Sequence, residues 1–424
     1  MLDIDVIRAD PDRVAAALSK RVDGVDLSGV LSLDDRRREQ RHLLEVKRSE
    51  RKQYAQQISE ARRAGGDSSG LEAEATELRT AISNLEAELA STEEQFHAAM
   101  VELPNVPADE VPAGGKEGNV VVKTWGEPRD LGDKGLDHVE LCTRLGLVDY
   151  ERGTKLGGSG FWLYKGRGAA LEWALLDYFC KSHVADGYEF MLPPHLLLTE
   201  CGYTAGQFPK FVDDVFLLAH DDDERERFLL PTSETAILNV YRDETLPLED
   251  LPIKAFAYTP CYRREKGGYR SDERGTVRGH QFNKVEIFQF VAEDGGDAAL
   301  REMVGKSERI VEELGLHYRT SLLAAKDASA SMKITYDIEV WIPSIGGYKE
   351  VSSASYAGDY QARRANIRYR PAGEKKTRYV HTLNASALAT SRLLPAIVEQ
   401  CQQPDGSIRV PEPLRDWLKT DTIA

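Results

Sequence analysis

Apolar residues recur in alternating steps of four and three over residues 71–103, a stretch without proline. They are Leu71, Ala75, Leu78, Ile82, Leu85, Leu89, Thr92, Phe96, Ala99 and Leu103. This spacing averages about 3.5 residues, the period of a coiled coil. Residues 33–63 carry a more broken apolar pattern, and the segment RAGGDSSG separates the two stretches. The pattern predicts two helices that fold back on each other as an antiparallel hairpin.

The pattern changes at residues 102–119, where the segment ELPNVPADEVPAGGKEGN is rich in proline and glycine. Such a segment is typical of a domain boundary, so we expect an N-terminal domain over 1–110 and a second domain over 111–424. In the second domain a hairpin-like loop joins adjacent strands, which favours an α+β fold with a mixed, largely antiparallel sheet flanked by helices. The expected helices include 168–186 and 296–314, and the expected strands include 253–260, 284–292 and 336–343.

Composition excludes several classes of protein. No apolar run approaches the roughly 20 residues that cross a bilayer, and the first residues, MLDIDVIRADPDRV, lack the basic end and apolar core of a signal peptide. The five cysteines are scattered without a CxxC pair, and the nine histidines show no HxxxH or HExxH spacing. We therefore expect a cytoplasmic protein without a membrane segment, a disulfide framework or structural zinc.

Residues 261–290, CYRREKGGYRSDERGTVRGHQFNKVEIFQF, depart from the acidic character of the chain. The net charge of −15 argues against a surface coated for nucleic acid, yet basic residues gather in this stretch. They are Arg263, Arg264, Lys266, Arg270, Arg274 and Arg278. No GxGxxG follows a strand and no GxxxxGK[ST] occurs, which argues against the usual glycine-loop nucleotide folds.

Strand alternation gives one face of this hairpin the chemistry of a nucleotide site. Residues two apart in a strand share a face, so Arg263 shares one with Glu265 before the loop. The residues expected on that face after the loop are Arg278, His280, Phe282, Lys284 and Glu286, with Val285 and Ile287 facing the core. Arginines suit phosphates, an aromatic ring suits a base, and a carboxylate suits an amino group. The alternative is an exposed hairpin laced by salt bridges.

The stretch YRREKGGYRSDERGTVRGHQFNKVE resembles motif 2 of class II aminoacyl-tRNA synthetases, in the form used by seryl-tRNA synthetases of the bacterial type. Four further segments resemble other parts of that family in the same order: DGYEFMLPPHLLL (186–198, motif 1), LPTSETA (230–236, serine-binding loop), YKEVSSASYAGDYQARRANIRYR (348–370, metal and ATP ligands) and TLNASALATSRLLPAIVEQCQ (382–402, motif 3). The resemblance covers essentially the whole chain. It implies a class II catalytic domain with an N-terminal coiled-coil arm.

The resemblance implies a serine–tRNA ligase that uses ATP and Mg²⁺. The serine carboxylate attacks the α-phosphate of ATP to give seryl-adenylate, and the seryl group then passes to the 3′-terminal adenosine of tRNA. Such steps need positioning and charge stabilisation rather than a nucleophilic side chain. The implied partners are L-serine, tRNA(Ser) and a second copy of the chain, because motif 1 forms the dimer interface of class II enzymes.

By resemblance, Arg263 bridges the α-phosphate and the serine carboxylate, and Arg392 covers the other side of the triphosphate, so both are the expected catalytic residues. Taken alone, Arg392 fits better as a solvated residue of a C-terminal helix. Glu350 and Ser353 are the expected Mg²⁺ and phosphate ligands, since that ion prefers hard oxygen atoms. The remaining expected ATP-binding residues are Arg264, Glu265 (adenine amino group), Arg278 (distal phosphates), Gly279, His280, Gln281, Phe282 (adenine stacking), Val351 and Ser352.

The residues that the resemblance assigns to the serine pocket are Thr232, Ser233, Glu234, Arg263, Glu286, Asn384 and Ser386. Glu286 and Ser386 would lie near the substrate hydroxyl. Polar groups built around a hydroxyl reject alanine strongly, because alanine leaves them buried and unpaired. Taken alone, Thr232 fits a helix N-cap, and Asn384 and Ser386 could also cap the following helix.

The first helix of the arm is basic and the second is mostly glutamate, with Arg79 as the main exception. This composition fits either a solvated coiled coil or an arm that lies along a phosphate backbone, and the arm's own sequence leaves both open. In the family the arm contacts the long variable arm of tRNA(Ser), and the catalytic domain contacts the acceptor stem. The expected tRNA-binding residues are Arg36, Arg37, Arg41, Arg48, Arg51 and Lys52.

Six positions depart from the family pattern: Glu273, Gly279, Tyr356, Ala385, Ala387 and Ser391. Alanine in place of a frequent glycine, as at Ala385 and Ala387, is expected to narrow or reshape the pocket. Substrate range and rate are therefore open. The competing hypotheses are a paralogue specialised for antibiotic biosynthesis or resistance, a protein that passes activated serine to another acceptor, and a non-catalytic tRNA-binding paralogue.

Overall fold

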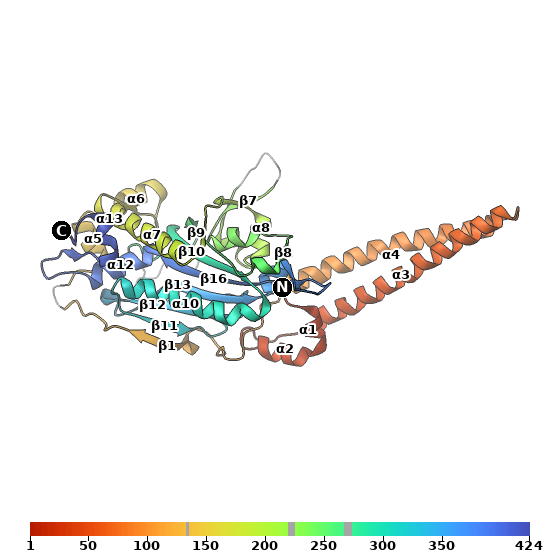
Figure 1. The fold of residues 1–424 in the computed structure, drawn as a ribbon, viewed down its shortest axis with the longest axis horizontal. Coiled ribbons are helices and arrows are strands. Elements are labelled where there is room, and N and C mark those ends of the chain that lie inside the picture. The colour runs from red at the N-terminus through yellow and green to blue at the C-terminus, as the bar shows by residue number, and fades with distance from the viewer. Residues whose placement is uncertain (133–134, 219–224, 267–273) are drawn as a thin grey trace. The chain divides into compact units, whose positions relative to one another are not determined.

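The computed structural model describes residues 1–132, 135–218, 225–266 and 274–424 (Figure 1). Contacts divide the chain into two compact units, Met1–Pro104 and Asn105–Ala424. Within the described residues, no helix is long and apolar enough to cross a membrane.

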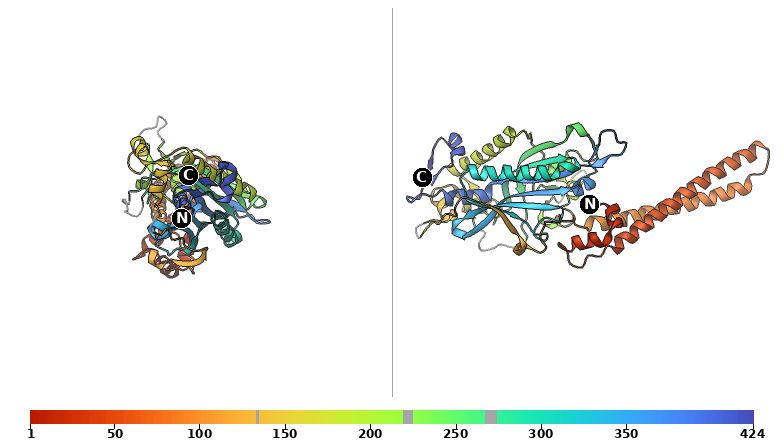
Figure 2. Two further views of the ribbon diagram at one scale, coloured as in Figure 1. Left: turned by 90° about the vertical axis from the view of Figure 1, so that its left-hand side faces the viewer. Right: turned by 60° about the horizontal axis from the view of Figure 1, so that its bottom comes forward.

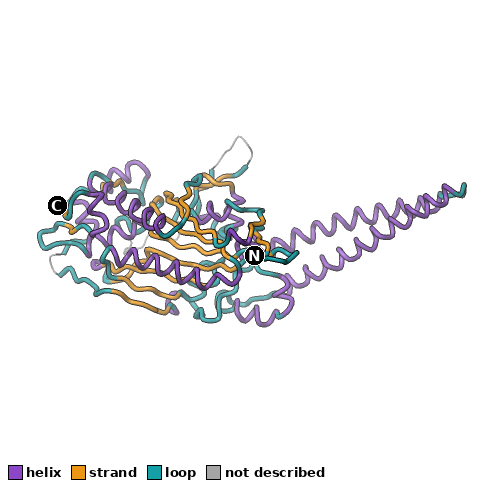
Figure 3. The backbone as a smooth tube through the Cα atoms, viewed as in Figure 1, coloured by secondary structure: helices purple, strands orange, loops and turns teal. Residues whose placement is uncertain are grey.

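The N-terminal unit is helical. Its elements are α1 (Ile4–Ala9), α2 (Pro11–Leu18), α3 (Ser28–Arg63) and α4 (Ser69–Glu102). The last two run side by side and antiparallel, as the tube in Figure 3 shows. Leu44 of α3 is buried against Leu78, Ile82 and Leu85 of α4, three of the positions in the period-3.5 pattern. The predicted helical hairpin is therefore confirmed.

The second unit is built on an eight-stranded sheet in the order β1-β11-β12-β13-β16-β10-β9-β4. All neighbours pair antiparallel except β4 and β9, which are parallel. The strands are β1 (Val120–Trp125), β4 (Glu189–Met191), β9 (Ile253–Tyr262), β10 (Gln281–Val291), β11 (Tyr318–Leu322), β12 (Ile334–Ile342), β13 (Gly347–Gly358) and β16 (His381–Ala389). The expected α+β fold with a mixed, largely antiparallel sheet is confirmed.

Helices cover both faces of this sheet, and two of them are the predicted helices (Figures 1 and 2). The helices are α5 (His138–Arg144), α6 (Tyr150–Gly157), α7 (Arg167–Ala185), α8 (Thr199–Thr204), α9 (Glu234–Asn239), α10 (Gly296–Glu313), α11 (Tyr360–Ala365), α12 (Thr390–Gln400) and α13 (Glu412–Leu418). The short strands that complete the unit are β2 (Val148–Asp149), β3 (Leu163–Tyr164), β5 (Leu196–Leu198), β6 (Phe216–Leu217), β7 (Arg227–Leu229), β8 (Thr245–Pro247), β14 (Arg368–Arg370), β15 (Arg378–Tyr379), β17 (Ile408–Arg409) and β18 (Thr422–Ile423).

The two faces of β10 show how the sheet positions the site. Val285 and Ile287 are fully buried in the large core formed with α7, α10 and α12, as their alternation predicts. Lys284 and Glu286, which alternate with them along the strand, point to the opposite face, where they contact each other. Because that face is also buried, β10 holds charged side chains inside the protein.

Candidate active site

The basic hairpin is part strand and part loop. β9 ends at Tyr262, which pairs with Gln281 at the start of β10, so the residues between them lie beyond the ladder. Glu265 has a left-handed backbone with φ of 49°. The prediction that strand alternation extends to Arg263, Glu265, Arg278 and His280 is therefore wrong, and it holds for Phe282, Lys284 and Glu286. Arg270 and Glu273, also named above, lie outside the described residues.

Loop contacts nevertheless bring the expected ATP-binding residues together. The Arg263 N–H donates to the carbonyl of His280 at 2.9 Å, which holds the two ends of the loop beside each other. Arg278 forms an ion pair with Glu265 at 2.8 Å. A cavity of about 40 Å³ lies beside these residues. Its lining includes Arg263, Glu265, Arg278, Gly279, Phe282, Lys284, Glu350, Val351, Ser386, Ser391 and Arg392.

Five of the expected ATP-binding residues lie outside this lining: Arg264, His280 and Gln281 near the loop, and Ser352 and Ser353 on β13. The backbone N–H of Arg264 donates to the carbonyl of Asp214 at 2.8 Å. The ring of His280 packs on Phe161 with centroids 5.3 Å apart, and its Nδ1 lies 3.1 Å from the carbonyl oxygen of Arg263. Gln281 is exposed at the first position of β10. These contacts give His280 a clear part in holding the loop.

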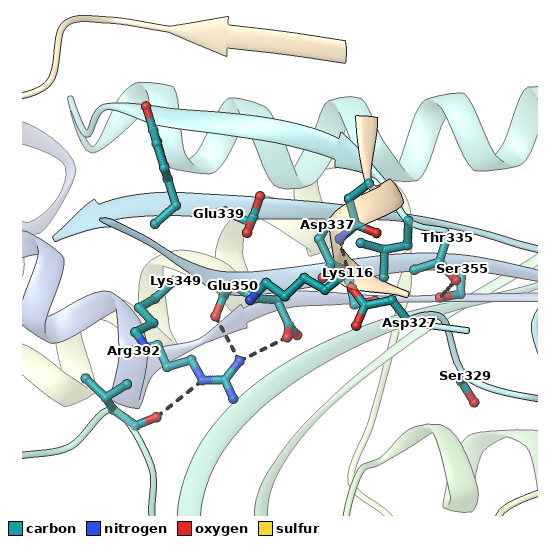
Figure 4. Close-up of a pocket in the computed structure, with 15 residues that line it drawn as sticks. Lys116, Asp327, Ser329, Thr335, Asp337, Glu339, Lys349, Glu350, Ser355 and Arg392 are labelled. Atoms are coloured by element: carbon teal, nitrogen blue, oxygen red, sulfur yellow. Dashed lines mark hydrogen bonds and ion pairs between the residues drawn. The ribbon is translucent and has the colours of Figure 1, made fainter. Parts of the chain in front are cut away.

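Arg392, near the N-terminal end of α12, links the loop to β13 (Figure 4). Its Nη1 donates to the carboxylate of Glu350 at 3.1 Å and to the Glu350 carbonyl at 3.0 Å, and its Nε donates to the carbonyl of Val277 at 3.3 Å. Burial acts to raise the pKa of Glu350, but the charges of Arg392 and Arg263 hold this pKa below its ordinary value. Glu350 therefore stays ionised beside two guanidinium groups.

A second cavity of about 310 Å³ shares Val277, Glu350 and Arg392 with the first and extends over β12 and β13 (Figure 4). Its lining is rich in oxygen atoms: Asp327, Ser329, Thr335, Asp337, Glu339, Glu350, Ser353 and Ser355. Asp337 is 9% exposed, and its Oδ1 has no hydrogen-bond partner among the described residues. Burial, and next the charge of Glu350, raise the pKa of Asp337. Hard donors at Glu350 and Ser353, beside an unpartnered carboxylate oxygen, fit Mg²⁺. The neighbouring Ser352 is fully buried and lines neither cavity.

The residues expected to bind serine converge on β10 from a separate loop. Thr232 lies just before α9 and is 5% exposed. Its hydroxyl accepts a hydrogen bond from Lys284 Nζ at 2.7 Å and lies 3.3 Å from Glu286 Oε2. Ser233, not Thr232, occupies the N-cap position of α9, and it makes no side-chain cap bond. Thr232 is therefore not the N-cap residue, although its hydroxyl accepts a hydrogen bond from the backbone N–H of Glu234, the first residue of α9, at 3.4 Å.

Glu234, the first residue of α9, is oriented by Gln361. The Gln361 amide donates to Glu234 Oε1 at 2.6 Å and is itself held by the hydroxyl of Thr382 at 2.7 Å. Burial first, and then the charge of Glu286, raise the pKa of Glu234 to about 7, against lowering contributions from Gln361, Lys284 and Arg263. Glu234 is therefore poised to titrate near neutral pH.

The two expected motif 3 residues differ in position. Ser386 lies opposite Glu286 in the β10–β16 ladder and lines the smaller cavity. Asn384 is buried, and its amide lies 3.9 Å from Met332 Sδ. Both lie within β16, so neither caps the following helix.

The departures from the family pattern have local explanations. A side chain at Gly279 would place its Cβ 2.1 Å from Trp162, which leaves no room for a larger residue. Tyr356 fills space left by Gly296, and its hydroxyl contacts His381. Ala385 and Ala387 are fully buried in the core on the other side of β16, so the expectation that they narrow the pocket is wrong. Ser391 lines the smaller cavity.

Two residues of this region were not assigned a role from the sequence, although Lys284 was expected on the site face of β10. Lys284 lies between Phe282 and Glu286 on the same face of β10, but the alternation pattern does not reveal that its ammonium reaches Thr232 across the pocket. Gln361 lies in the sequence between 348 and 370 but contacts a residue more than 100 positions away. No local pattern in the sequence could have identified either contact.

The basic residues of α3 gather on one side of that helix. At 100° per residue, the six expected tRNA-binding residues fall within an arc of about 160°. Arg41 pairs with Glu93 at 2.5 Å and Arg48 pairs with Glu86 at 2.8 Å, while Arg37 pairs with Asp34 at 2.6 Å. Arg36, Arg51 and Lys52 are exposed and make no ion pair within the described part of the chain.

Comparison with known proteins gives matches over both units. Residues 216–401 match the family model of the tRNA synthetase class II core domain (G, H, P, S and T), and residues 1–107 match that of the seryl-tRNA synthetase N-terminal domain. The chain is 54% identical over 426 residues to serine–tRNA ligase 2 of Clostridium acetobutylicum, with 100% of each covered. It is 40% identical over 432 residues to the serine–tRNA ligase of Synechococcus elongatus, covering 100% of this chain and 99% of that relative.

A solved structure is also similar over its whole length. The seryl-tRNA synthetase from Pyrococcus horikoshii, in a crystal structure complexed with ATP, aligns with a TM-score of 0.93 at 31% sequence identity. The alignment covers 100% of this chain and 99% of that chain.

Proposed function

The chain belongs to the seryl-tRNA synthetase family, and from this premise we propose that it activates L-serine with ATP and transfers the seryl group to tRNA(Ser). It is an ATP-dependent aminoacyl-tRNA synthetase of class II, and the expected fold and family are confirmed. The observation that carries the proposal is the gathering of Arg263, Glu265, Phe282, Glu350 and Arg392 around one cavity. This arrangement favours an active enzyme over a catalytically silent paralogue.

In the first step a serine carboxylate oxygen attacks the α-phosphorus of ATP. A new oxygen–phosphorus bond forms, the bond to the bridging oxygen breaks, and pyrophosphate leaves with the electron pair. Arg263 lies 5.2 Å from the centroid of the Phe282 ring, so its guanidinium is close to the surface on which adenine would stack. A planar guanidinium can hold an α-phosphate oxygen and a carboxylate oxygen together, which keeps the reactants in line.

The remaining charges of the triphosphate fall to Arg278 and Arg392. Both guanidinium groups are occupied by carboxylates, Glu265 and Glu350, and a nucleotide would draw them onto phosphates instead. Release of Glu265 from Arg278 leaves its oxygens available for the adenine amino group. Mg²⁺, held by Glu350 and Ser353, would supply charge neutralisation at the phosphates.

In the second step a hydroxyl of the terminal adenosine of tRNA attacks the seryl carbonyl carbon, and AMP leaves with the bridging oxygen. The chain offers positioning and charge for this step, and no side chain of the site needs to form a covalent intermediate. The basic side of α3 would bind the variable arm of the tRNA through phosphate contacts. We also propose a homodimer, formed through α7 and β4.

The test is ATP–pyrophosphate exchange with each of the amino acids, followed by charging of tRNA(Ser). We expect exchange with serine, weak exchange with alanine or threonine, and seryl-tRNA as the product. Exchange with serine without charging would indicate a different acceptor. No exchange with any amino acid would overturn the proposed function.

A further inference from the structure

We propose that Lys284 is a positioning residue that makes the serine pocket require a hydrogen-bond donor on the substrate side chain. The inference rests on the proposed function and adds a residue that determines specificity. Lys284 is 5% exposed, and a buried ammonium is costly unless other groups satisfy it. Both of its partners, Thr232 and Glu286, belong to the serine pocket. The contacts that stabilise this buried charge are therefore made by residues of the pocket itself.

The ammonium fixes the direction of the hydrogen bonds around it. A lysine ammonium can only donate, so the Thr232 hydroxyl oxygen accepts from Lys284 at 2.7 Å. The same oxygen accepts from the backbone N–H of Glu234 at 3.4 Å. With both lone pairs engaged, the single hydroxyl proton of Thr232 is directed to Glu286 Oε2, 3.3 Å away.

This arrangement leaves one particular oxygen of Glu286 for the substrate. Oε2 receives both the Lys284 ammonium and the Thr232 hydroxyl. Among the described residues, both of these contacts are made by Oε2 and no hydrogen bond to Oε1 is found, while the side chain of Glu286 is 2% exposed as a whole. An ionised carboxylate can only accept, so the missing partner must be a donor, such as the hydroxyl of serine. Alanine offers no donor and would leave Oε1 buried and unpaired.

Lys284 also balances the charge of the pocket. Glu234 and Glu286 face each other there, and the cations near them are Lys284 on β10 and Arg263 beyond β9, with the neutral Gln361 on α11. The charge of Lys284 lowers the pKa of Glu234, which burial and Glu286 otherwise raise. Removal of the ammonium would therefore raise this pKa further and protonate Glu234 at a higher pH.

The experiment compares Lys284→Met with the wild-type full-length enzyme in ATP–pyrophosphate exchange. Methionine keeps much of the side-chain length and removes the charge and the donors. We expect the KM for serine to rise about tenfold or more, and the preference for serine over alanine in kcat/KM to fall by a similar factor. The KM for ATP should stay within about twofold. As the pH falls, the rise in the KM for serine should begin at a higher pH than in the wild type.

Two further variants separate positioning from a structural role. Lys254→Met removes a partly buried lysine of the neighbouring strand β9, paired with Glu302 at 2.8 Å outside the pocket, and should leave the serine-to-alanine preference unchanged. Lys284→Arg keeps the charge but replaces a compact ammonium with a planar group, so it should lose part of the preference and keep the wild-type pH profile. If Lys284→Met does not fold, as judged by circular dichroism, Lys284→Arg alone carries the test.

An unchanged serine KM and serine-to-alanine preference in these Lys284 variants would overturn the inference. Parallel increases in KM for serine and ATP, with no change in preference, would do the same, because they would indicate a general loss of structure. Either result would overturn the inference alone, provided that the wild-type enzyme catalyses serine-dependent exchange. A wild-type enzyme without serine exchange would instead overturn the proposed function.

Discussion

Glu234 and Glu350 are both partly buried carboxylates, yet their neighbours move their pKa values in opposite directions. Burial acts to raise both. Glu350 lies beside Arg392 and Arg263, whose positive charges outweigh that effect. Glu234 faces the charge of Glu286, which adds to the effect of burial. One carboxylate is therefore fixed in the ionised form, and the other can change its charge near neutral pH.

We expect the titration of Glu234 to appear in the pH dependence of serine activation. Its ionised form would hold the ammonium group of serine, and protonation below its pKa of about 7 removes that charge. At saturating ATP, kcat/KM for serine should therefore fall about tenfold per pH unit well below pH 7. Glu234→Gln should have low activity and lose this pH dependence. A flat wild-type profile down to about pH 5 would contradict the role of Glu234.

Arg263 should be the most sensitive residue of the site to truncation. Its Nε donates to the carbonyl of Pro231 at 3.2 Å. Arg263 therefore connects the serine-binding loop (230–236) to the smaller cavity, which it lines. We expect Arg263→Ala to lower the rate of serine-dependent exchange by about 100-fold or more, since a charge-stabilising donor is lost. Arg152→Ala removes an exposed arginine that pairs with Asp149 on the surface, and it should be neutral. Near-normal exchange by Arg263→Ala would remove this residue from the proposed mechanism.

At the scale of elements, the sequence predicted regular structure well and loop geometry poorly. The alternation of β10 identified the core-facing Val285 and Ile287 and the pocket-facing Phe282 and Glu286, because side-chain direction in a strand depends on local geometry alone. It failed at Glu265, where a left-handed backbone replaces the strand. The pairing of Arg278 with Glu265 depends on how the loop closes, which periodicity does not encode.

The helical arm allows a sharper test than its deletion. Arg36, Arg51 and Lys52 project from the same side of α3 without an ion pair among the described residues, whereas Arg41 and Arg48 pair with glutamates of α4. We expect the triple alanine variant of the three unpaired residues to raise the KM for tRNA(Ser) about tenfold and to weaken the salt dependence of charging. Its serine-dependent exchange should equal that of the wild type.

Arg79→Ala provides the matched control, because Arg79 is an exposed arginine of the other helix, α4. It should leave tRNA charging unchanged. Equal charging by the triple variant and the wild type would contradict the role of the α3 surface. It would favour the interpretation of the arm as a solvated coiled coil.

At the scale of the whole molecule, the sheet edge at β4 bears on assembly. β4 is the last strand of the sheet, and exposed apolar side chains cluster in sequence around it: Trp173, Val184, Phe190 and Leu192. Leu192 is 73% exposed, which is unusual for a leucine beside an unpaired sheet edge. The resemblance at motif 1 indicated a dimer, but periodicity alone could not, since contacts between copies leave no period in a sequence.

We expect the wild-type protein to sediment as a dimer and Leu192→Asp to shift it towards the monomer, because a charge would be buried at the interface. Leu156→Asp is the control: Leu156 on α6 is 79% exposed, and its replacement should leave the dimer intact. Analytical ultracentrifugation at micromolar concentration measures both. A wild-type monomer, or an unaffected Leu192→Asp dimer, would contradict an interface at β4.

The most direct measurement is a crystal structure with a non-hydrolysable seryl-adenylate analogue. The account predicts adenine stacked on Phe282, the phosphate-mimicking group at Arg263, and the serine hydroxyl within hydrogen-bond distance of Glu286. An analogue bound elsewhere would contradict it. So would a cavity that stays empty, with Arg278 and Arg392 still paired to Glu265 and Glu350.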